Sequence, residues 1–558
     1  MSQMAGVFSE DEDLADKLAT ILEVFHPQSI TKTNPKSKEY QWLINSVVGS
    51  PDGSRVLAEV SLPIAENPFQ QPYIDHENNL VFMYDGKFYN SREVASRLKE
   101  NHHLTGEKDG ALIAHLFREL PGSLEEKVRR ALKYLDGDYA LAVSSPEQTV
   151  IARNSLGTKP LYFAEGGGIL SFASNKKALW QIGFDDVIPL RAGTLAVFDQ
   201  EGIKIKKAWP IEKGEIEIED MTQAVDRYQE AIYSAVKKRL SGIDKAGVLL
   251  SGGVDSCLLA KLVHDIGSPA GIKTIAYTAG FADSTDIDFA RRFAEETTLN
   301  HKVKVLSIDK VEEYIPKVIE AVEERDFVQI EAGIGIYAAL DMAVQDGIRV
   351  VFAGQGADEL WGGYDWYPEV LNQEGSQGLS QRMLEDIYRG DIETLDRENK
   401  MARAHGIEMI FPYLDAKVVT LAMSVAPQLK VFCEDDHLGK HPHRQLAQRI
   451  GISAEYAKRS KDAAQHGTGI HGVLDEISRK NGFNADNVKS IGYSSDKVTT
   501  EKLGSSSRYG YQYAQKSLWQ VPQNVQFFFD MLAYEKGLLN KLEREKIKYF
   551  LDRMRFNS

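Results

Sequence analysis

Hydrophobic and polar positions divide the chain into two parts with different patterns. Residues 1 to about 208 carry short apolar runs separated by Asp-Gly, Gly-Asp and Gly-Gly-Gly sequences, a pattern typical of β-strands joined by turns. The strand candidates are 79–84, 139–143, 149–152, 161–163 and 194–198. Apolar residues at helical spacing predict helices over 11–25, 91–101 and 109–118. This mixture predicts a layered α+β domain, which ends in a strand over 204–212 and a charged linker over 212–219.

From Met221 onward, strands and helices alternate. A long amphipathic helix is expected over 221–240, and helices dominate again after Leu379. Strand-like runs fall at 247–250, 274–277, 303–306 and 349–352, and helical segments at 286–298, 311–322 and 333–344. This order predicts an α/β domain with a parallel sheet, helices on both faces, and ligands beyond the carboxyl ends of the strands. Residues 471–507 are polar and poorly periodic, and 509–556 are expected to be helical.

Length and charge narrow the possibilities further. With 558 residues the chain is expected to form two or three domains, which we place at 1–208, 220–485 and 486–558. The net charge is −15, from 66 basic and 81 acidic residues, which argues against binding to nucleic acid or to an anionic membrane. The only cysteines, Cys257 and Cys433, cannot make a disulfide framework or a zinc site. We expect a cytoplasmic protein with no signal peptide and no apolar run near the ~20 residues of a membrane helix.

One loop carries the clearest chemical signal. The apolar run Val248–Leu250 leads into Ser251-Gly-Gly-Val-Asp-Ser256, and apolar residues at helical spacing follow. A glycine loop between a strand and a helix N-terminus presents backbone N–H groups to an anion. Asp255 suits a Mg²⁺ ion that contacts phosphate. The string lacks the lysine of the GxxxxGK[ST] loop and resembles the PP-loop of ATP pyrophosphatases, although an ordinary βα turn of small residues is the plainer alternative.

A second strand and glycine loop extend this resemblance to a whole family. Val350–Tyr364 contains Gly354-Gln-Gly-Ala-Asp-Glu359 and Gly362-Gly-Tyr364. Further motifs lie at 405–415, 440–444 and 459–461 in this half, and at 85–93, 135–140, 153–162 and 173–178 in the first half. Together they resemble the asparagine synthetase family. The resemblance implies an N-terminal Ntn-hydrolase-like αββα sandwich, glutaminase-like, and a PP-loop synthetase domain of the adenine nucleotide alpha hydrolase-like kind, with 486–558 as its helical extension.

The resemblance also implies a reaction and a set of residues. Members activate a carboxylate with ATP, release pyrophosphate and let an amine displace AMP from the acyl-adenylate. Carried over onto this sequence, the catalytic lysines are Lys440 and Lys461, and the Mg²⁺ ligands are Asp255 and Asp358. The residues expected to bind ATP are Leu250, Ser251, Gly252, Gly253, Asp255, Ser256, Ala279, Ala353 and Gly354. The resemblance also implies a homodimer. For either lysine considered without its motif, a solvated surface charge is the simpler interpretation.

The first half departs from the family where its chemistry should lie. Ala5 stands in place of the N-terminal cysteine nucleophile, and three residues precede Met4, so no terminal amine is available as base. The Arg-Gly-Pro-Asp stretch expected near 31–41 is absent. The Asn-Gly-Glu sequence reads Asp85-Gly-Lys87, so a carboxylate replaces an amide donor to the oxyanion, and a retained Asp109 would be only a relic. We therefore expect no glutaminase activity, whether Ala5 is natural or engineered.

The second half departs at one position. Gln355 replaces a glutamate of the family, and an amide cannot serve as a general base at neutral pH. The related β-lactam synthetases carry tyrosine there. Glu331, His405 and Glu408 are candidate replacements, although each is singly more consistent with an ordinary surface or hydrogen-bonded residue.

Three functions remain open at this point. The first is an ATP-dependent, AMP-forming ligase that amidates aspartate or a similar carboxylate with free ammonia. The second is the same chemistry with a substrate-borne amine, as in β-lactam synthetases. The third is a non-catalytic paralogue whose first half binds a partner. The presence of Asp255, Asp358 and Lys440 argues against this third function.

Overall fold

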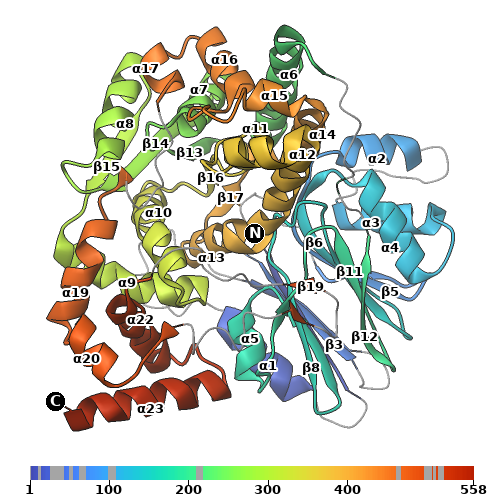
Figure 1. Ribbon diagram of the computed structural model, residues 1–558. Helices are drawn as coiled ribbons and strands as arrows, with labels where there is room; N and C mark the ends of the chain where they lie inside the picture. The colour runs from blue at the N-terminus through green and yellow to red at the C-terminus, as the bar shows by residue number, and fades with distance from the viewer. Residues whose placement is uncertain are drawn as a thin grey trace. The chain divides into compact units, whose positions relative to one another are not determined.

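The chain forms two compact units in the computed structural model. The described residues are 2–9, 14–25, 43–49, 55–61, 71–98, 109–208, 211, 218–459, 467–495, 505–506, 511–512 and 521–557. The first unit comprises Met1–Ile211, Leu503–Gln515 and Asn540–Leu542, and the second comprises Glu212–Lys502, Lys516–Leu539 and Glu543–Ser558. Figure 1 shows a β-rich region in blue and cyan and a helix-rich region in green to red.

The first unit is a four-layer sandwich of two antiparallel sheets between helices. One sheet has the order β10 (Ile188–Pro189), β8 (Tyr162–Gly166), β9 (Ile169–Ala173), β1 (Ser2–Phe8), β3 (Arg55–Ser61), β2 (Leu43–Gly49). The other has the order β12 (Gly202–Lys207), β11 (Thr194–Asp199), β7 (Thr149–Arg153), β6 (Gly137–Ser144), β5 (Leu80–Phe88), β4 (Tyr73–Asp75). Its helices are α1 (Ala15–Phe25), α2 (Ser91–Leu98), α3 (Asp109–Glu119), α4 (Leu124–Tyr134) and α5 (Lys176–Gln181).

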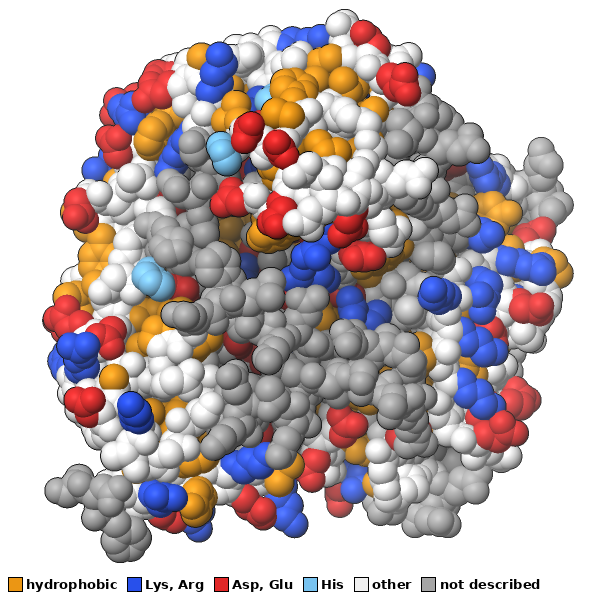
Figure 2. Space-filling model, in the orientation of Figure 1, with side chains coloured by type: hydrophobic (Ala, Val, Ile, Leu, Met, Phe, Trp, Pro, Cys, Tyr) orange, Lys and Arg blue, Asp and Glu red, His pale blue; other side chains and the backbone are white. Residues whose placement is uncertain are grey.

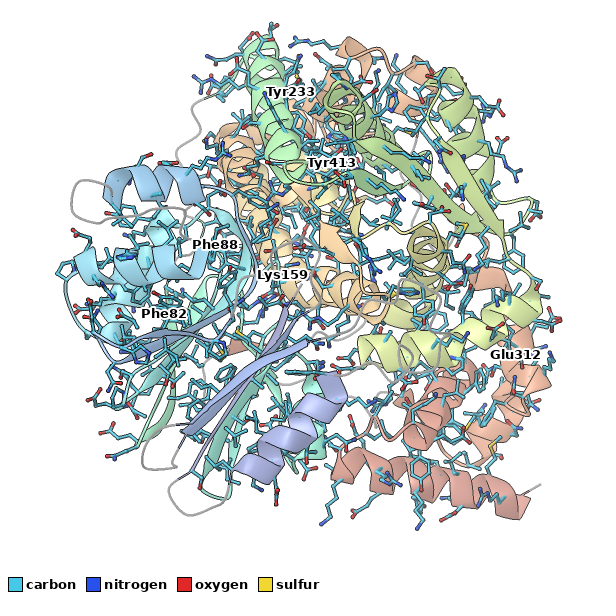
Figure 3. The ribbon with its side chains drawn as sticks, turned by 180° about the vertical axis from the view of Figure 1, so that it is seen from behind. Phe82, Phe88, Lys159, Tyr233, Glu312 and Tyr413 are labelled. Carbon is cyan, nitrogen blue, oxygen red and sulfur yellow. The ribbon has the colours of Figure 1, made fainter. Side chains whose placement is uncertain are left out.

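Three hydrophobic layers hold this sandwich together, and alternation along β1 shows how. Met4 and Phe8 pack between the two sheets, while Ala5 and Val7 face α1 and α5, because successive strand residues point to opposite faces. A third cluster packs α2, α3 and α4 against the second sheet, and it includes Phe82 and Phe88, labelled in Figure 3. The αββα sandwich expected from the resemblance is confirmed.

The second unit is built on a five-stranded parallel sheet. The order is β15 (His301–Val305), β14 (Lys273–Gly280), β13 (Lys245–Leu249), β16 (Val350–Phe352) and β17 (Glu408–Ile410), with every neighbouring pair parallel. The predicted parallel-sheet α/β fold is therefore confirmed. Strand β17 was missed, because three residues are too short for a periodic signal. A small separate pair, β18 (Ser505–Ser506) and β19 (Tyr511–Gln512), belongs to the first unit.

Helices make up most of the rest of the second unit. Those before β17 are α6 (Met221–Arg239), α7 (Val254–Gly267), α8 (Thr285–Glu296), α9 (Ile308–Val322), α10 (Phe327–Gln345), α11 (Ala357–Trp361), α12 (Tyr367–Glu393) and α13 (Leu395–Ala404). Those after it are α14 (Ala416–Ser424), α15 (Pro427–Lys430), α16 (His441–Arg449), α17 (Ala454–Ala457), α19 (Leu474–Lys480), α20 (Ala485–Ser490), α22 (Gln523–Glu535) and α23 (Lys541–Asn557). The segment 471–507, read as poorly periodic, thus contains α19 and α20, which are too short to show an apolar face.

Helix α10 corrects one expectation. It has 19 residues with a mean hydropathy of 1.4, which by length and composition is enough to cross a membrane. The expectation that no such run exists was wrong for this helix. Half of the stretch is buried inside the unit, where α10 packs against β14 and helices α9 and α13, and core helices commonly share this composition.

Charged side chains on the surface are mixed in sign. Figure 2 shows acidic and basic groups interspersed over the face that it presents. The charged side chains described on that face therefore do not form one field of a single sign.

Candidate active site

Two loops meet at the carboxyl end of the parallel sheet in the second unit. Strands β13 and β16 are parallel neighbours, with Val248 paired to Phe352. The chain leaves β13 toward β14 on one side, while β16 lies on the other side. Such a reversal of strand order opens a crevice beyond the strand ends, where ligands of α/β sheets bind. The loops 250–253 and 353–356 lie there.

Local hydrogen bonds fix the first loop. The Ser256 hydroxyl accepts a bond from the Ser251 N–H at 3.1 Å and donates to the Gly253 carbonyl at 3.0 Å. Gly252 has φ +74°, and a Cβ there would lie 2.4 Å from the Phe289 Cβ, so only glycine fits. The loop leads directly into the 14-residue helix α7, whose first N–H groups and dipole favour an anion.

Lys440 is the centre of an ion cluster that joins the two loops. Its Nζ lies 2.8 Å and 2.6 Å from the two carboxylate oxygens of Asp255, and 2.5 Å from Oδ1 of Asp358. Asp255 lies in the first turn of α7 and Asp358 in the first turn of α11. Lys440 is only 1% exposed, so its charge is little screened by water. The cluster therefore brings residues 103 positions apart, Asp255 and Asp358, to one cation.

A glycine and a strained backbone make room for this lysine. A Cβ at Gly363 would lie 2.0 Å from Oδ1 of Asp358 and 2.1 Å from Cε of Lys440. Lys440 itself has φ +55° and ψ +30°, a left-handed conformation immediately before α16. For a residue with a Cβ this conformation costs about 1–3 kcal/mol, and such strain is concentrated at functional sites.

Buried polar side chains surround Asp255. The Tyr228 hydroxyl lies 2.8 Å from Nδ1 of His443, whose Nε2 lies 3.1 Å from Oδ1 of Asp255. Burial lowers the pKa of His443 and raises that of Tyr228 well above its usual value. Both groups are therefore neutral, and one hydrogen bond joins the Tyr228 hydroxyl to Nδ1 of His443. The Tyr413 hydroxyl, labelled in Figure 3, donates to the Asp255 backbone carbonyl at 2.8 Å.

Two arginines hold the surrounding backbone. Arg444 donates to four carbonyls, those of Leu438, Gly439, Ala457 and Arg459, at 2.8–2.9 Å. Arg459 donates to the Ser251 carbonyl at 2.9 Å and to the Asp286 carboxylate at 3.1 Å. These bonds tie the segments on either side of α16 to the first loop.

These groups line a cavity of about 200 Å³. Most of the residues predicted from the sequence lie in its wall: Leu250, Ser251, Gly253, Asp255, Ser256, Ala279, Ala353, Gly354, Asp358 and Lys440. Gly252 is not among the described lining residues. Lys461 lies outside the described residues, as do 31–41 and the side chain of Asp109. The structure thus gathers these positions, while their roles in binding and catalysis stay predictions.

One acid in the wall was missed by sequence reasoning. Glu398 on α13 accepts a hydrogen bond at Oε1 from Nε2 of Gln355 and lies 3.5 Å from Nη2 of Arg397. Its Oε2 is buried and has no hydrogen-bond partner among the residues that the structure describes. Burial, only partly offset by Arg397 and Gln355, raises the pKa of Glu398 to about 7.

The three bases proposed from the sequence lie elsewhere. None of Glu331, His405 and Glu408 is in the described lining of the cavity. Glu331 pairs with Nδ1 of His471, and Nδ1 of His405 is 2.8 Å from the Met401 carbonyl. Glu408 begins β17, opposite Val350. No sequence pattern pointed to Glu398, because it lies in a run of charged residues that reads as a surface helix.

The side chains present also indicate which metal ion this site could bind. No three His, Cys, Asp or Glu side chains within the described ranges are grouped to hold a metal. Asp255 and Asp358 converge on one point that already carries the positive charge of Lys440. Two carboxylates completed by phosphate oxygens are a usual Mg²⁺ site. The residues present therefore fit Mg²⁺ together with a phosphate-bearing ligand.

In the first unit, the position where the family carries its cysteine nucleophile is an alanine, Ala5. Ala5 lies in the middle of β1, paired with Ala58 on one side and Ala173 on the other. It is fully buried in the cluster under α1 and α5. The residues before it are also fixed, since the Met4 N–H donates to the Ser174 hydroxyl at 2.9 Å and Gln3 to the Phe25 carbonyl at 3.2 Å. Asp85 is buried in β5, opposite Ala140.

Comparisons with known proteins agree with this division. The asparagine synthase family matches residues 227–384 and 369–530, and the glutamine amidotransferase domain family matches residues 59–181. A protein of Methanocaldococcus jannaschii, provisionally named asparagine synthetase (glutamine-hydrolyzing) 1, is 30% identical over 486 residues, which cover 78% of this chain and 86% of that protein. Asparagine synthetase (glutamine-hydrolyzing) 3 of Arabidopsis thaliana is 27% identical over 65% of this chain and 62% of its own length. The Rattus norvegicus enzyme of that name is 25% identical over 70% and 72%.

Proposed function

Because this chain belongs to the asparagine synthetase family, we propose that it is an AMP-forming ligase that amidates aspartate or a similar carboxylate with free ammonia. The family's reaction is ATP-dependent amide formation. The observation that carries the proposal is the cluster of Asp255, Asp358 and Lys440 at the carboxyl ends of β13 and β16. A cation held between two carboxylates beside a glycine loop suits the handling of a triphosphate.

Each part of this site has a role in the proposed reaction. The N–H groups of the loop 251–253 and the first turn of α7 bind the phosphates. The carboxylate oxygen attacks the α-phosphorus, pyrophosphate leaves, and Lys440 stabilises the negative charge that develops during transfer. The amine then attacks the acyl carbon and AMP leaves. Mg²⁺ held by Asp255 and Asp358 would supply further charge neutralisation on the phosphates.

The remaining predicted residues complete the proposal. The backbone around Leu250, Ala279, Ala353 and Gly354 would hold adenosine, since these positions share the wall of the cavity. Lys461 would be a second cation near pyrophosphate.

We further propose that the first unit does not hydrolyse glutamine. A buried methyl group, Ala5, occupies the centre of β1, and both neighbouring strands pair with its backbone. A strand in that position offers neither a nucleophilic sulfur nor a terminal amine. Ammonia would therefore have to come from solution.

One assay tests the proposal. The purified chain is incubated with ATP, Mg²⁺ and aspartate, with ammonium chloride or glutamine as the nitrogen source, and AMP, pyrophosphate, asparagine and glutamate are measured. We expect asparagine and AMP in equal amounts with ammonium, and neither asparagine nor glutamate with glutamine. Glutamate release from glutamine would contradict our account of the first unit.

The alternatives give different results in the same assay. Pyrophosphate release that requires another carboxylate, one that carries its own amine, would indicate the β-lactam synthetase-like reaction. No turnover across a panel of carboxylates would indicate a non-catalytic paralogue. A control variant for this assay is Lys417→Met, which removes an exposed lysine of α14. It should leave every product unchanged.

A further inference from the structure

Amide formation needs a base, and the family's position for it carries an amide in this chain. When ammonia attacks the acyl carbon, the nitrogen acquires a positive charge and must lose a proton. Gln355 cannot take that proton at neutral pH. Some other group in the cavity has to do so, if the proposed function is correct.

Elimination among the groups in the wall leaves one acid. The carboxylates in the described lining are Asp255, Asp286, Asp358 and Glu398, and that lining contains no histidine. Asp255 and Asp358 bind Lys440, and Asp286 binds Arg459 at 3.1 Å. Glu398 contacts Arg397 only at 3.5 Å and only through Oε1. Its Oε2 is buried without a hydrogen-bond partner among the described residues, whereas each of the three aspartates is ion-paired with a cation.

We propose that Glu398 is the general base of the amide-forming step, a role that rests on the proposed ligase function. The nitrogen lone pair forms the C–N bond, and the C–O bond to AMP breaks with its electron pair leaving on AMP. The N–H proton passes to Oε2 of Glu398, which becomes a carboxylic acid and later releases the proton to water. Gln355 positions the carboxylate by its hydrogen bond to Oε1.

Three features of the surroundings support this assignment. Glu398 is fully buried, so its negative charge is not well stabilised, and its pKa of about 7 suits a base that works at neutral pH. Gln355 belongs to the same loop as Gly354 and precedes Asp358 by three residues, which places Glu398 beside the segment expected to hold the nucleotide.

Ion pairs engage charged groups on the elements that surround α13. The helices α9, α10 and α12 and the strand β17 pack against α13. Acids on or next to these elements that form ion pairs include Glu323 and Asp396 with Lys400, Glu331 with His471, Asp341 with Lys304, and Asp386 and Glu393 with Arg389. Glu408 on β17 lies outside the lining of the cavity. The group that faces Glu398 directly with a charge is Arg397.

Separating the two half-reactions tests the proposal. Adenylation is followed by aspartate-dependent exchange of labelled pyrophosphate into ATP without ammonia, and amide formation by asparagine produced with ammonia. Glu398→Gln keeps the side-chain volume and an oxygen that can accept from Gln355. We expect pyrophosphate exchange to stay within about threefold and amide formation to fall by about 10²-fold to 10⁴-fold.

A second acid serves as the control. Glu331→Gln neutralises a buried carboxylate on α10 that is 2% exposed and lies outside the described lining. Both half-reactions should remain within about threefold of the unmodified protein. Glu398→Asp, which keeps a carboxylate on a shorter side chain, should lose less amide formation than Glu398→Gln.

The pH dependence gives a readout that a purely structural role would not change. With hydroxylamine in place of ammonia, and with the rate expressed per concentration of unprotonated hydroxylamine, hydroxamate formation should rise with pH through an apparent pKa of about 7. The reason is that the base acts in its ionised form. This rise should be absent in Glu398→Gln.

The possible outcomes are distinct. Equal losses of exchange and amide formation in Glu398→Gln, or no loss in either, would overturn the role of Glu398 while leaving the ligase function intact. If the unmodified protein shows neither half-reaction with any carboxylate, the proposed function fails and this inference fails with it.

Discussion

The centre of β1 in the first unit and the crevice between β13 and β16 in the second differ in backbone pairing and in the charge of their side chains. Around Ala5 both edges of the strand are paired and the side chain packs among apolar residues. At the carboxyl ends of β13 and β16 pairing stops, and the wall contains four carboxylates, Lys440 and two arginines. One region satisfies every requirement of a packed core, and the other gathers charge that a core would exclude.

The difference shows which features of a fold can persist without chemistry. Antiparallel pairing and apolar layers stabilise the first unit whatever occupies position 5, provided that the side chain is small. The second site depends instead on mutually compensating charges, since Asp255 and Asp358 need Lys440 as much as it needs them. Changes in the crevice should therefore have large effects on activity, and changes at Ala5 should have almost none.

The largest effect is expected from Lys440→Met. It removes the cation from two partly buried carboxylates, and with it the positive charge that we propose faces the reacting phosphate. Loss of a single stabilising group in such a site costs about 10²–10³ in rate, and breaking a buried ion pair costs about 3–5 kcal/mol of stability. We expect aspartate-dependent pyrophosphate exchange to fall by about 10³-fold, the upper end of that range, because both carboxylates lose their cation. Exchange within tenfold of the unmodified protein would show that the cluster is structural.

A smaller but still large effect is expected from Gly363→Ala. The new Cβ would lie 2.0 Å from Oδ1 of Asp358 and 2.1 Å from Cε of Lys440, so the lysine must shift. Misplacement by about 1 Å can cost 10²-fold in rate, and we expect a loss of that order in pyrophosphate exchange. Gly472→Ala is the matched control, because nothing lies within 4 Å of its new methyl group. Equal activities of the two variants would contradict the close packing of Lys440.

How much the sequence could predict follows from the same contrast. The loop 251–256 and the loop 354–359 were identified because strand, glycine turn and helix start are neighbours in the sequence. The sandwich of the first unit followed from the family resemblance, while its helix α4 was missed. Yet α4 had a readable signal, since Ser123 and Glu126 form a capping box in which each side chain accepts from the other's N–H.

Glu398 could not be found in this way. Helix α13 carries five charged residues among ten, and Leu395–Arg403 are nevertheless all buried. A helix with that composition has no apolar face and predicts a solvated surface. Its burial is decided by ion pairs such as Lys400 with Asp396 and Glu323, which depend on contacts with α9 that are remote in the sequence. The buried position of Glu398, the proposed base, therefore depends on tertiary packing, whereas the proposed phosphate loop can be recognised from local sequence.

Gln355→Leu tests the hydrogen bond between Gln355 and Glu398. We expect it to lower amide formation at pH 7 by about 3-fold to 10-fold. The Gln355 N–H donates to the Glu398 carboxylate and lowers its pKa relative to burial alone. Without that bond the pKa of Glu398 rises further above its usual value, so less of it is ionised at pH 7. Amide formation should fall at pH 7 and recover as the pH rises, with pyrophosphate exchange unchanged. A pH–rate profile that keeps its midpoint, or moves it to lower pH, would contradict this coupling.

The smallest effect on activity is expected from Ala5→Cys, which tests the other half of the comparison. The variant restores a thiol at the family's position but not a terminal amine, because Ser2–Met4 continue β1 before it. Asp85 is also buried on β5 where an amide donor would be needed. We expect no glutamate release from glutamine above background, unchanged asparagine formation from ammonia, and a loss of about 1–3 kcal/mol in stability if the sulfur overpacks the layer under α1 and α5. Glutamate release by this variant would show that the first unit lacks only its sulfur, and that its strands still shape a glutamine site.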